Sequence, residues 1–395
     1  MRLVSAVVRT TSGWSIAAMM LAACASPGVP PGGPVDTEAP KIVQIAPDSA
    51  KTGVTPKEVI FRFDEVVNER PSGAASLSGL FLISPRSGEP RVEWHRSEIS
   101  VRPRRGWKPN TAYTITLLPG LGDLRGNTRT TGAVTLFSTG PTIPAGRIGG
   151  TFFNWAEGRA APRGLIEARP RSDTTIVYIT SADSVGHFVL STLPPGPYLV
   201  RGYADDNNNK DLDPREPWDS AAVTVVDSAS ADIYAFVHDS LGARLTGVAV
   251  RDSVTLELNF DNPLAPAPLP GVANIRIRAS DSTDVPVLSI APPPQDTTLT
   301  ATTRLALPIP PQDTTRKATV RLARPIPPRT LIVKLGRPIR ARADYRVRVI
   351  DIRNLMGVVR SSERLLSVPA PPPVVPPAAA PPPPPPPPPP APVIR

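Results

Sequence analysis

The stretch Val59-Ile60-Phe61-Arg62-Phe63-Asp64 places three large apolar side chains, at 59, 61 and 63, on one face of an extended chain. This alternation is typical of a strand with one buried face. Similar short segments follow at 99–101, 113–117 and 134–137, separated by turns rich in Gly, Pro and Asn. The 54 prolines of the 395-residue chain argue against extensive helix. Residues 37–141 are therefore predicted to form an antiparallel β-sandwich.

The third region of the chain repeats parts of the first. Val254-Thr255-Leu256-Glu257-Leu258-Asn259-Phe260-Asp261 matches the strand that ends in Phe63-Asp64, and the segment from Tyr345 to Gly357 matches the strand at Tyr113 and its following turn. This copy has extra residues, mostly in a Pro/Thr/Asp-rich interval at 292–315, which is either a loop or disordered. Residues 243–368 are predicted to be one divergent copy of the first sandwich, although more than one domain stays possible.

The middle region, residues 145–240, starts a new series of strands. Thr175-Ile176-Val177-Tyr178-Ile179-Thr180 is one of them, and a turn at Pro194-Pro195-Gly196 leads into a strand that begins near Tyr198. Residues 369–395 include ten consecutive prolines and cannot form a core, so they are predicted to be a disordered, proline-rich tail. The fold class is therefore all-β, with tandem antiparallel β-sandwiches.

Two of these regions resemble known families. Ala39-Pro40-Lys41-Ile42-Val43, the strand 59–67, Pro109-Asn110-Thr111-Ala112-Tyr113 and Gly122-Asp123-Leu124-Arg125-Gly126-Asn127 resemble the bacterial Ig-like domain first described in S-layer proteins. The segment 186–200 is similar to the carboxypeptidase-regulatory or transthyretin-like fold. The first resemblance implies a structural or adhesive module and carries over no catalytic residue. It also makes residues 243–368 a divergent Ig-like domain.

The N-terminus contains Leu21-Ala22-Ala23-Cys24 after a short apolar segment, with Arg2 and Arg9 ahead of it. This arrangement resembles the signal of bacterial lipoproteins, which implies cleavage of residues 1–23, a covalent lipid on Cys24 and attachment to a membrane. Residues 24–36 then form a tether. Ala25 and Ser26 supply no acidic residue, so resemblance to diderm lipoproteins implies the outer membrane of the cell envelope. The alternative is an ordinary cleavable signal followed by a free thiol.

The net charge of the chain also limits the classes of partner that it can bind. The formal net charge is +10, and removal of Arg2 and Arg9 leaves +8. The arginines are scattered along alternating strands without an aromatic-basic cluster, so no nucleic-acid partner is expected. Anionic envelope polymers or lipid head groups are the better candidates, and a solvated Arg-rich surface is the alternative.

One acidic loop has the spacing of a calcium site. Oxygen-bearing side chains occupy positions one, three, five, seven, nine and twelve of a loop. These residues are Asp205, Asn207, Asn209, Asp211, Asp213 and Glu216. Lys210 stands where an EF-hand has glycine, and Pro214 prevents an ordinary following helix, so the loop resembles the calcium loops between strands of extracellular sandwiches. The alternative is a turn rich in Asp and Asn without a metal.

The sequence predicts no enzyme, because it lacks a Gly-x-Ser-x-Gly motif and its one cysteine is assigned to lipid. A spatial pair of carboxylates stays open as an alternative. Trp155, Tyr203 and Trp218 form either a platform for sugar rings or part of a core. The predicted function is that of a lipid-anchored structural or adhesive protein of the cell envelope, with an envelope polysaccharide or protein as partner. The alternative is a carbohydrate-binding or polysaccharide-handling surface lipoprotein.

Overall fold

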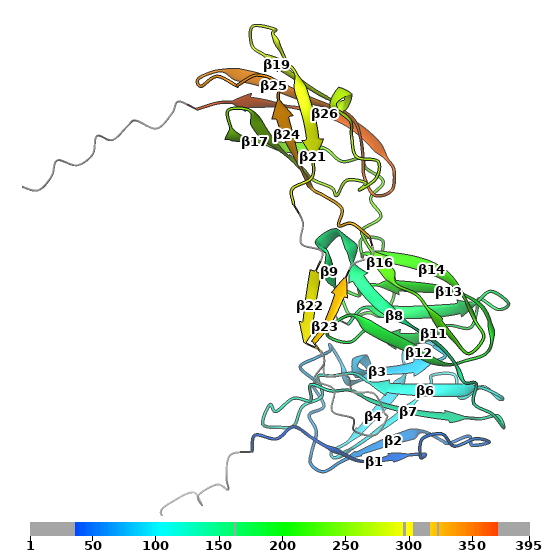
Figure 1. Cartoon of the computed structure of the whole chain (residues 1–395). Coiled ribbons are helices and arrows are strands. Elements are labelled where there is room, and N and C mark those ends of the chain that lie inside the picture. Colours follow the sequence, from blue (N-terminus) through cyan, green and yellow to red (C-terminus); the bar gives the residue numbers. More distant parts are fainter. Residues whose placement is uncertain (1–35, 162, 295–297, 303–316, 322–323, 370–395) are drawn as a thin grey trace, which may run out of the picture.

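The computed structural model describes residues 36–369 except 162, 295–297, 303–316 and 322–323. The predicted signal peptide, Cys24, nearly all of the tether and the proline-rich tail lie outside the described residues. The described chain is almost entirely β-structure, and three sandwiches follow one another along the molecule (Figure 1). The predicted fold class is therefore confirmed.

The first sandwich has two sheets that enclose the predicted apolar face. Val59, Phe61 and Phe63 are all buried, as their alternation predicts. One sheet has the order β1-β2-β5-β4, and the other has the order β3-β6-β7. The strands are β1 (Ile42–Ala46), β2 (Val59–Phe63), β3 (Phe81–Ser84), β4 (Arg91–His95), β5 (Glu98–Arg102), β6 (Ala112–Leu117) and β7 (Ala133–Ser138), with a 3-10 helix at Leu77–Leu80.

The middle sandwich is built differently. One sheet has the order β11-β10-β13-β14, and the other is centred on β8, which pairs with β12, β15, β16 and β9. The strands are β8 (Gly146–Asn154), β9 (Arg159–Ala160), β10 (Leu165–Pro170), β11 (Tyr178–Ser181), β12 (His187–Leu193), β13 (Gly196–Tyr203), β14 (Trp218–Val225), β15 (Ser228–Ser230) and β16 (Ile233–Ala235), with a 3-10 helix at Trp155–Glu157. The transthyretin-like character of this domain stays a prediction.

The third sandwich repeats the strand order of the first. Its sheets are β17-β18-β24-β21 and β20-β19-β25-β26. The strands are β17 (Leu245–Asp252), β18 (Thr255–Phe260), β19 (Ile275–Ala279), β20 (Asp284–Val285), β21 (Val287–Ala291), β24 (Thr330–Leu335), β25 (Asp344–Arg353) and β26 (Val359–Ser367), with a 3-10 helix at Val272–Asn274. The strands that correspond to β1 to β7 of the first sandwich are, in the same order, β17, β18, β19, β21, β24, β25 and β26.

Local contacts are repeated as well. The Tyr113 hydroxyl accepts a hydrogen bond from the Lys108 backbone N–H at 2.7 Å. In the third sandwich the Tyr345 hydroxyl accepts one from the Arg340 N–H at 2.8 Å, across the same sequence separation. These shared contacts support the prediction that the third region is a divergent copy of the first.

The interval between β21 and β24 differs from the loop expected there. It contains an antiparallel hairpin of β22 (Thr298–Thr302) and β23 (Lys317–Arg321). In the first sandwich the equivalent connection, between β4 and β5, is a short turn. A hairpin was not predicted because the interval is dominated by Pro, Thr and Asp, which favour turns over strands.

Candidate functional site

The predicted calcium loop connects β13 to β14 and is folded tightly on itself. The Asp205 carboxylate accepts hydrogen bonds from the backbone N–H groups of Asn209 at 3.0 Å and Lys210 at 2.9 Å. Lys210 takes a left-handed backbone conformation, with φ of 63°. An EF-hand places glycine at this sixth position because its loop turns sharply there. The loop therefore turns sharply at Lys210, the position where an EF-hand has glycine.

Five of the six predicted ligands are linked within the loop. The side-chain amides of Asn207 and Asn209 donate to the same Asp213 oxygen, at 2.6 and 3.0 Å. Glu216, only 4% exposed, accepts the backbone N–H groups of Asp206 and Asp213, both at 2.9 Å. These contacts close the loop from its first residue to its last.

Asp211, the remaining predicted ligand, points out of the loop. Its carboxylate accepts a hydrogen bond from the Arg86 guanidinium of the first sandwich at 2.7 Å. The neighbouring Lys210 ammonium donates to the backbone carbonyls of Ser78 at 3.0 Å and Phe81 at 2.8 Å, also in the first sandwich. The loop therefore holds two domains together, a role that its spacing did not reveal.

Whether calcium fits this loop depends on the two asparagines. As placed, their NH₂ groups face Asp213, whereas a hard cation requires oxygen. Their Oδ1 atoms accept the backbone N–H groups of Asn209 at 3.0 Å and Asp211 at 2.7 Å, so a half-turn of either amide would set its NH₂ group against a backbone donor. Among the described residues, three carboxylates with oxygens within 4.8 Å of one another occur elsewhere, at Asp36, Glu65 and Asp123. The oxygen-bearing side chains left within the loop are those of Asp205, Asn207, Asn209, Asp213 and Glu216, and calcium binding by them stays a prediction.

A buried carboxylate lies beside the loop. Glu167 in β10 is 2% exposed, and its oxygens accept hydrogen bonds from Arg86 at 3.2 Å, Arg169 at 3.0 Å and Arg201 at 2.9 Å. Burial acts to raise the pKa of Glu167, but the hydrogen bonds and charges of Arg169 and Arg201 outweigh it and lower the pKa below its usual value. Arg86 reaches Glu167 from the first domain, so this buried ion pair joins the first two sandwiches.

Apolar contacts and backbone hydrogen bonds complete this junction. Leu82 of β3 is buried in one cluster with Leu165, Ile179 and Tyr203 of the middle domain. The Ile179 N–H donates to the Ser84 hydroxyl at 3.0 Å. A backbone N–H to carbonyl bond adjoins it, from Arg86 to Val177 at 2.7 Å. We name this set of contacts between the first two sandwiches the junction.

The three aromatic residues predicted as a sugar platform do not lie together as one. Tyr203 is 0% exposed, and its hydroxyl donates to the Lys210 carbonyl at 2.8 Å, so its ring belongs to the junction. Burial raises its pKa. Trp155 and Trp218 instead lie at the two ends of a row of half-buried rings that passes through Phe236 and His238.

We name Trp155, Phe236, His238 and Trp218 the aromatic row. Successive ring centroids are 5.8, 4.4 and 3.9 Å apart. The sequence reasoning missed Phe236 and His238, although their two-residue spacing was a usable signal because it places both on one side of an extended chain. At one end, the Trp155 indole N–H donates to the Pro325 carbonyl at 3.0 Å, so the third domain touches the row.

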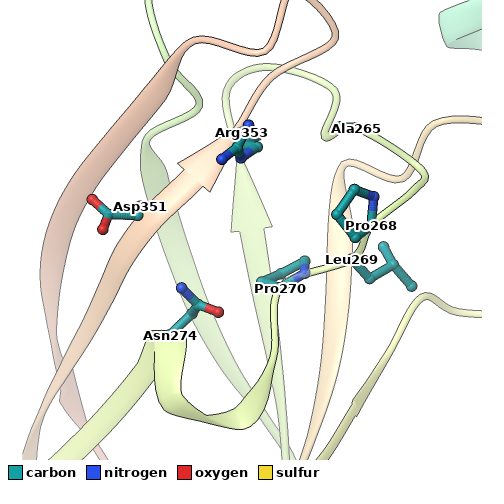
Figure 2. Close-up of a pocket in the computed structure, with 7 residues that line it drawn as sticks. All are labelled: Ala265, Pro268, Leu269, Pro270, Asn274, Asp351 and Arg353. Atoms are coloured by element: carbon teal, nitrogen blue, oxygen red, sulfur yellow. The ribbon is translucent and has the colours of Figure 1, made fainter.

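The third domain also has a cavity of about 340 Å³ (Figure 2). Its walls come from the segment 265–270, from Asn274 and from Asp351 and Arg353 of β25. The Asn274 amide donates to the Ile350 carbonyl at 3.0 Å, and the Asp351 carboxylate accepts from Ser361 at 3.4 Å. Asn274 and Asp351 are therefore each hydrogen-bonded to a neighbour in the same domain.

Residues 36–139 match the model of the bacterial Ig-like domain, and the resemblance stated for this region is confirmed. No curated protein matches the chain. Among the described residues, no helix has the length and apolarity needed to span a bilayer.

Several solved structures align with the chain at low similarity. A candidate carbohydrate-binding protein from Bacteroides uniformis ATCC 8492 is 12% identical, with 57% of this chain and 100% of that chain covered and a TM-score of 0.17. Domains 1–6 of surface layer protein SbsC are 10% identical, with 85% and 55% covered and a TM-score of 0.19. BcpA, the major pilin subunit of Bacillus cereus, is 9% identical, with 48% and 67% covered and a TM-score of 0.18. Scores this low carry no argument about function.

Proposed function

We propose that this protein is a non-enzymatic structural or adhesive arm of the cell envelope, anchored to the outer membrane by a lipid on Cys24. The observation that carries this proposal is the junction. Domains in one chain ordinarily move relative to one another, unless the interface between them is extensive. Here a buried carboxylate, a lysine from the acidic loop and an apolar cluster join the first two sandwiches. Such a coupled pair suits a protein that spans a distance or holds a partner at a fixed position.

The anchor is tested by metabolic labelling. Cells grown with labelled palmitate should incorporate the label into the wild-type protein and not into Cys24→Ser, because only the thiol accepts a thioether-linked lipid. Fractionation of the same cells should place the wild type with outer membranes. Equal labelling of both proteins would overturn the anchor, and labelled protein in inner-membrane fractions would overturn the destination.

We further propose that calcium occupies the acidic loop and strengthens the junction. A ligand that binds only the folded state stabilises it by about 2.7 kcal/mol at a hundredfold excess over its Kd. Chelation should therefore lower the melting temperature, and magnesium should substitute poorly because it demands near-ideal octahedral geometry. Asp205→Ala should abolish the calcium response, whereas Asp211→Ala should keep it because Asp211 faces Arg86. An unchanged melting curve with chelator and no heat on calcium addition would exclude the metal.

The aromatic row supports carbohydrate binding as a second candidate function. Exposed aromatic rings in a row are suited to stacking on sugar rings, and Trp155, Phe236, His238 and Trp218 are each only partly buried. A glycan array with the wild-type chain and Phe236→Ala tests this directly. Binding that depends on Phe236 would favour the carbohydrate-binding function, and an array without hits would leave the structural function as the better supported one.

A further inference from the structure

The outer face of the sheet β20-β19-β25-β26 carries four arginines in two directly opposed pairs. Arg276 of β19 lies opposite Arg348 of β25, and Arg278 lies opposite Arg346. All four side chains are exposed. Arg278 forms an ion pair with Asp284 at 2.9 Å, whereas the other three form no ion pair within the described part of the chain. We name these four residues the arginine face.

Like charges placed directly opposite each other on a sheet oppose its folding. Arginines two positions apart on one strand are separated by about 7 Å, and those on neighbouring strands by about 5 Å. Three of the four arginines therefore lie close together without an ion pair among the described residues, where scattered arginines would be easier to accommodate.

The same face of the first sandwich is the one that docks the middle domain. Because β3 and β6 correspond to β19 and β25, Leu82, Ser84 and Thr114 take the places of Arg276, Arg278 and Arg346. Leu82 and Ser84 contact the middle domain in the junction, and the Thr114 hydroxyl is 3.2 Å from that of Thr192. In the third sandwich no described segment covers the equivalent side chains, which are exposed and charged.

We propose that the arginine face of the third domain binds a linear anionic polysaccharide. A guanidinium donates in a fixed fork that matches carboxylate and phosphate groups. Two rows of such forks, one on β19 and one on β25, would line both sides of a chain that runs parallel to the strands.

Acidic residues at the edges of the face favour a narrow polymer over a flat membrane. Asp284 of β20 is paired with Arg278 in the sheet register, and Glu363 of β26 is paired with Arg348. Asp344 closes one end of β25. A membrane lying on this sheet would press anionic head groups against these carboxylates, whereas a single chain can follow the two central strands between them. The described strands present no aromatic side chain on this face, which disfavours a nucleic acid that requires base stacking.

The test is a binding measurement with the purified full-length chain and polygalacturonate as the anionic polysaccharide. Neutral dextran is the polymer control. The variant Arg346→Gln/Arg348→Gln should bind about tenfold more weakly and lose about two units of the slope of log K against log salt, one for each cation removed. The matched control Arg104→Gln/Arg105→Gln removes the same charge from an exposed turn of the first domain and should change affinity less than about twofold.

Removal of opposed arginines should leave the melting temperature unchanged or higher, and Arg276→Gln supplies a second variant if the double variant does not fold. The proposal is overturned if polygalacturonate does not bind, or if both double variants lose affinity equally. It is also overturned if phosphatidylcholine–phosphatidylglycerol vesicles or duplex DNA bind more tightly with the same dependence on the arginine face. The arginine variants leave Cys24 unchanged, so their difference from the wild type is independent of the lipid anchor.

Discussion

The first and third sandwiches share a strand order, yet they differ in one group of polar residues. We name this group the corner of each sandwich. In the first, Asp36, Glu65 and Asp123 bring three carboxylates together. In the third, the residues at the same places are Asp239, Asn262 and Asn354. The Asn262 amide donates to the Asp239 carboxylate, and the Asn354 amide donates to the Asp239 carbonyl, both at 2.8 Å.

This difference shows that the same strand arrangement can hold either three carboxylates or one carboxylate with two amides. In the third domain the Asn262 amide donates to the single carboxylate, that of Asp239. The Asn354 amide donates to the backbone carbonyls of Asp239 and Leu241, so this corner holds only one charge. In the first domain, burial raises the pKa of Glu65, and the charges of Asp36 and Asp123 raise it further. The Asn127 amide supplies the donors instead, to the Asp123 carboxylate at 2.7 Å and the Asp36 carbonyl at 3.1 Å.

The largest expected effect comes from loss of the carboxylate at this corner. Asp123 is 1% exposed and accepts the backbone N–H groups of Arg125 and Asn127, both at 2.8 Å. Asp123→Ala leaves these donors without a partner and should lower the free energy of unfolding by about 3 kcal/mol. Asp123→Asn, which copies Asn354 of the third domain, keeps an acceptor and should lower it by less than about 1 kcal/mol. Urea denaturation measures both variants, and equal losses would contradict the equivalence of the two corners.

A second comparison concerns the ion pairs of two arginines of the first domain. Arg86→Ala removes one of three cations around the buried Glu167 and should lower the free energy of unfolding by about 2 kcal/mol, less than for an isolated buried pair because Arg169 and Arg201 remain. Arg62→Ala, which breaks an exposed pair with Glu98, should lower it by at most about 1 kcal/mol. If the two variants lose the same amount, the junction contributes no special stability.

The junction should also respond to pH through Lys210. Burial lowers the pKa of this lysine to about 8 in the folded protein, whereas the unfolded chain has an ordinary lysine pKa near about 10.4. Between these values the unfolded state binds more protons, so stability should rise as pH increases from 8. Unfolding measured from pH 8 to about 9.5, before tyrosines of the unfolded chain ionise, should show this rise in the wild type and not in Lys210→Met. A parallel profile for both would contradict it.

The smallest effect is expected for Glu65→Gln. This change replaces a carboxylate by an amide, as Asn262 does in the third domain, and removes its repulsion with Asp36 and Asp123. The melting temperature at neutral pH should rise slightly, by an amount typical of surface substitutions. The gain should disappear in acid, where Glu65 of the wild type is protonated. A lower melting temperature at neutral pH would show that the third carboxylate stabilises the corner.

Much of the fold could be predicted because it rests on local patterns. The alternation at Val59, Phe61 and Phe63 identified a buried face, and the repeated Tyr113 and Tyr345 segments identified the duplicated sandwich. The hairpin of β22 and β23 was missed because its sequence favours turns, and its pairing joins strands separated by a long interval.

The position of the acidic loop could be predicted from the sequence, but its contacts with the first sandwich could not. The spacing from Asp205 to Glu216 predicted a calcium loop, with a metal-free turn as the alternative. The structure shows a closed turn, because Asp and Glu side chains bond to nearby backbone N–H groups, and the metal stays a prediction. Contacts of Asp211 with Arg86, and of Lys210 with Ser78, join residues more than a hundred positions apart. No local pattern encodes such pairs. For the same reason the sequence left Tyr203 open between a sugar platform and a core, and the structure shows it buried.

The central claim, that the first two sandwiches form one coupled arm, is tested most directly by scanning calorimetry of the full-length chain. The account predicts one cooperative transition for the first and middle domains together and a separate one for the third. Arg86→Ala/Lys210→Met should split the coupled transition in two, with little change in that of the third domain. Three independent transitions in the wild type, or a double variant that melts like the wild type, would contradict it.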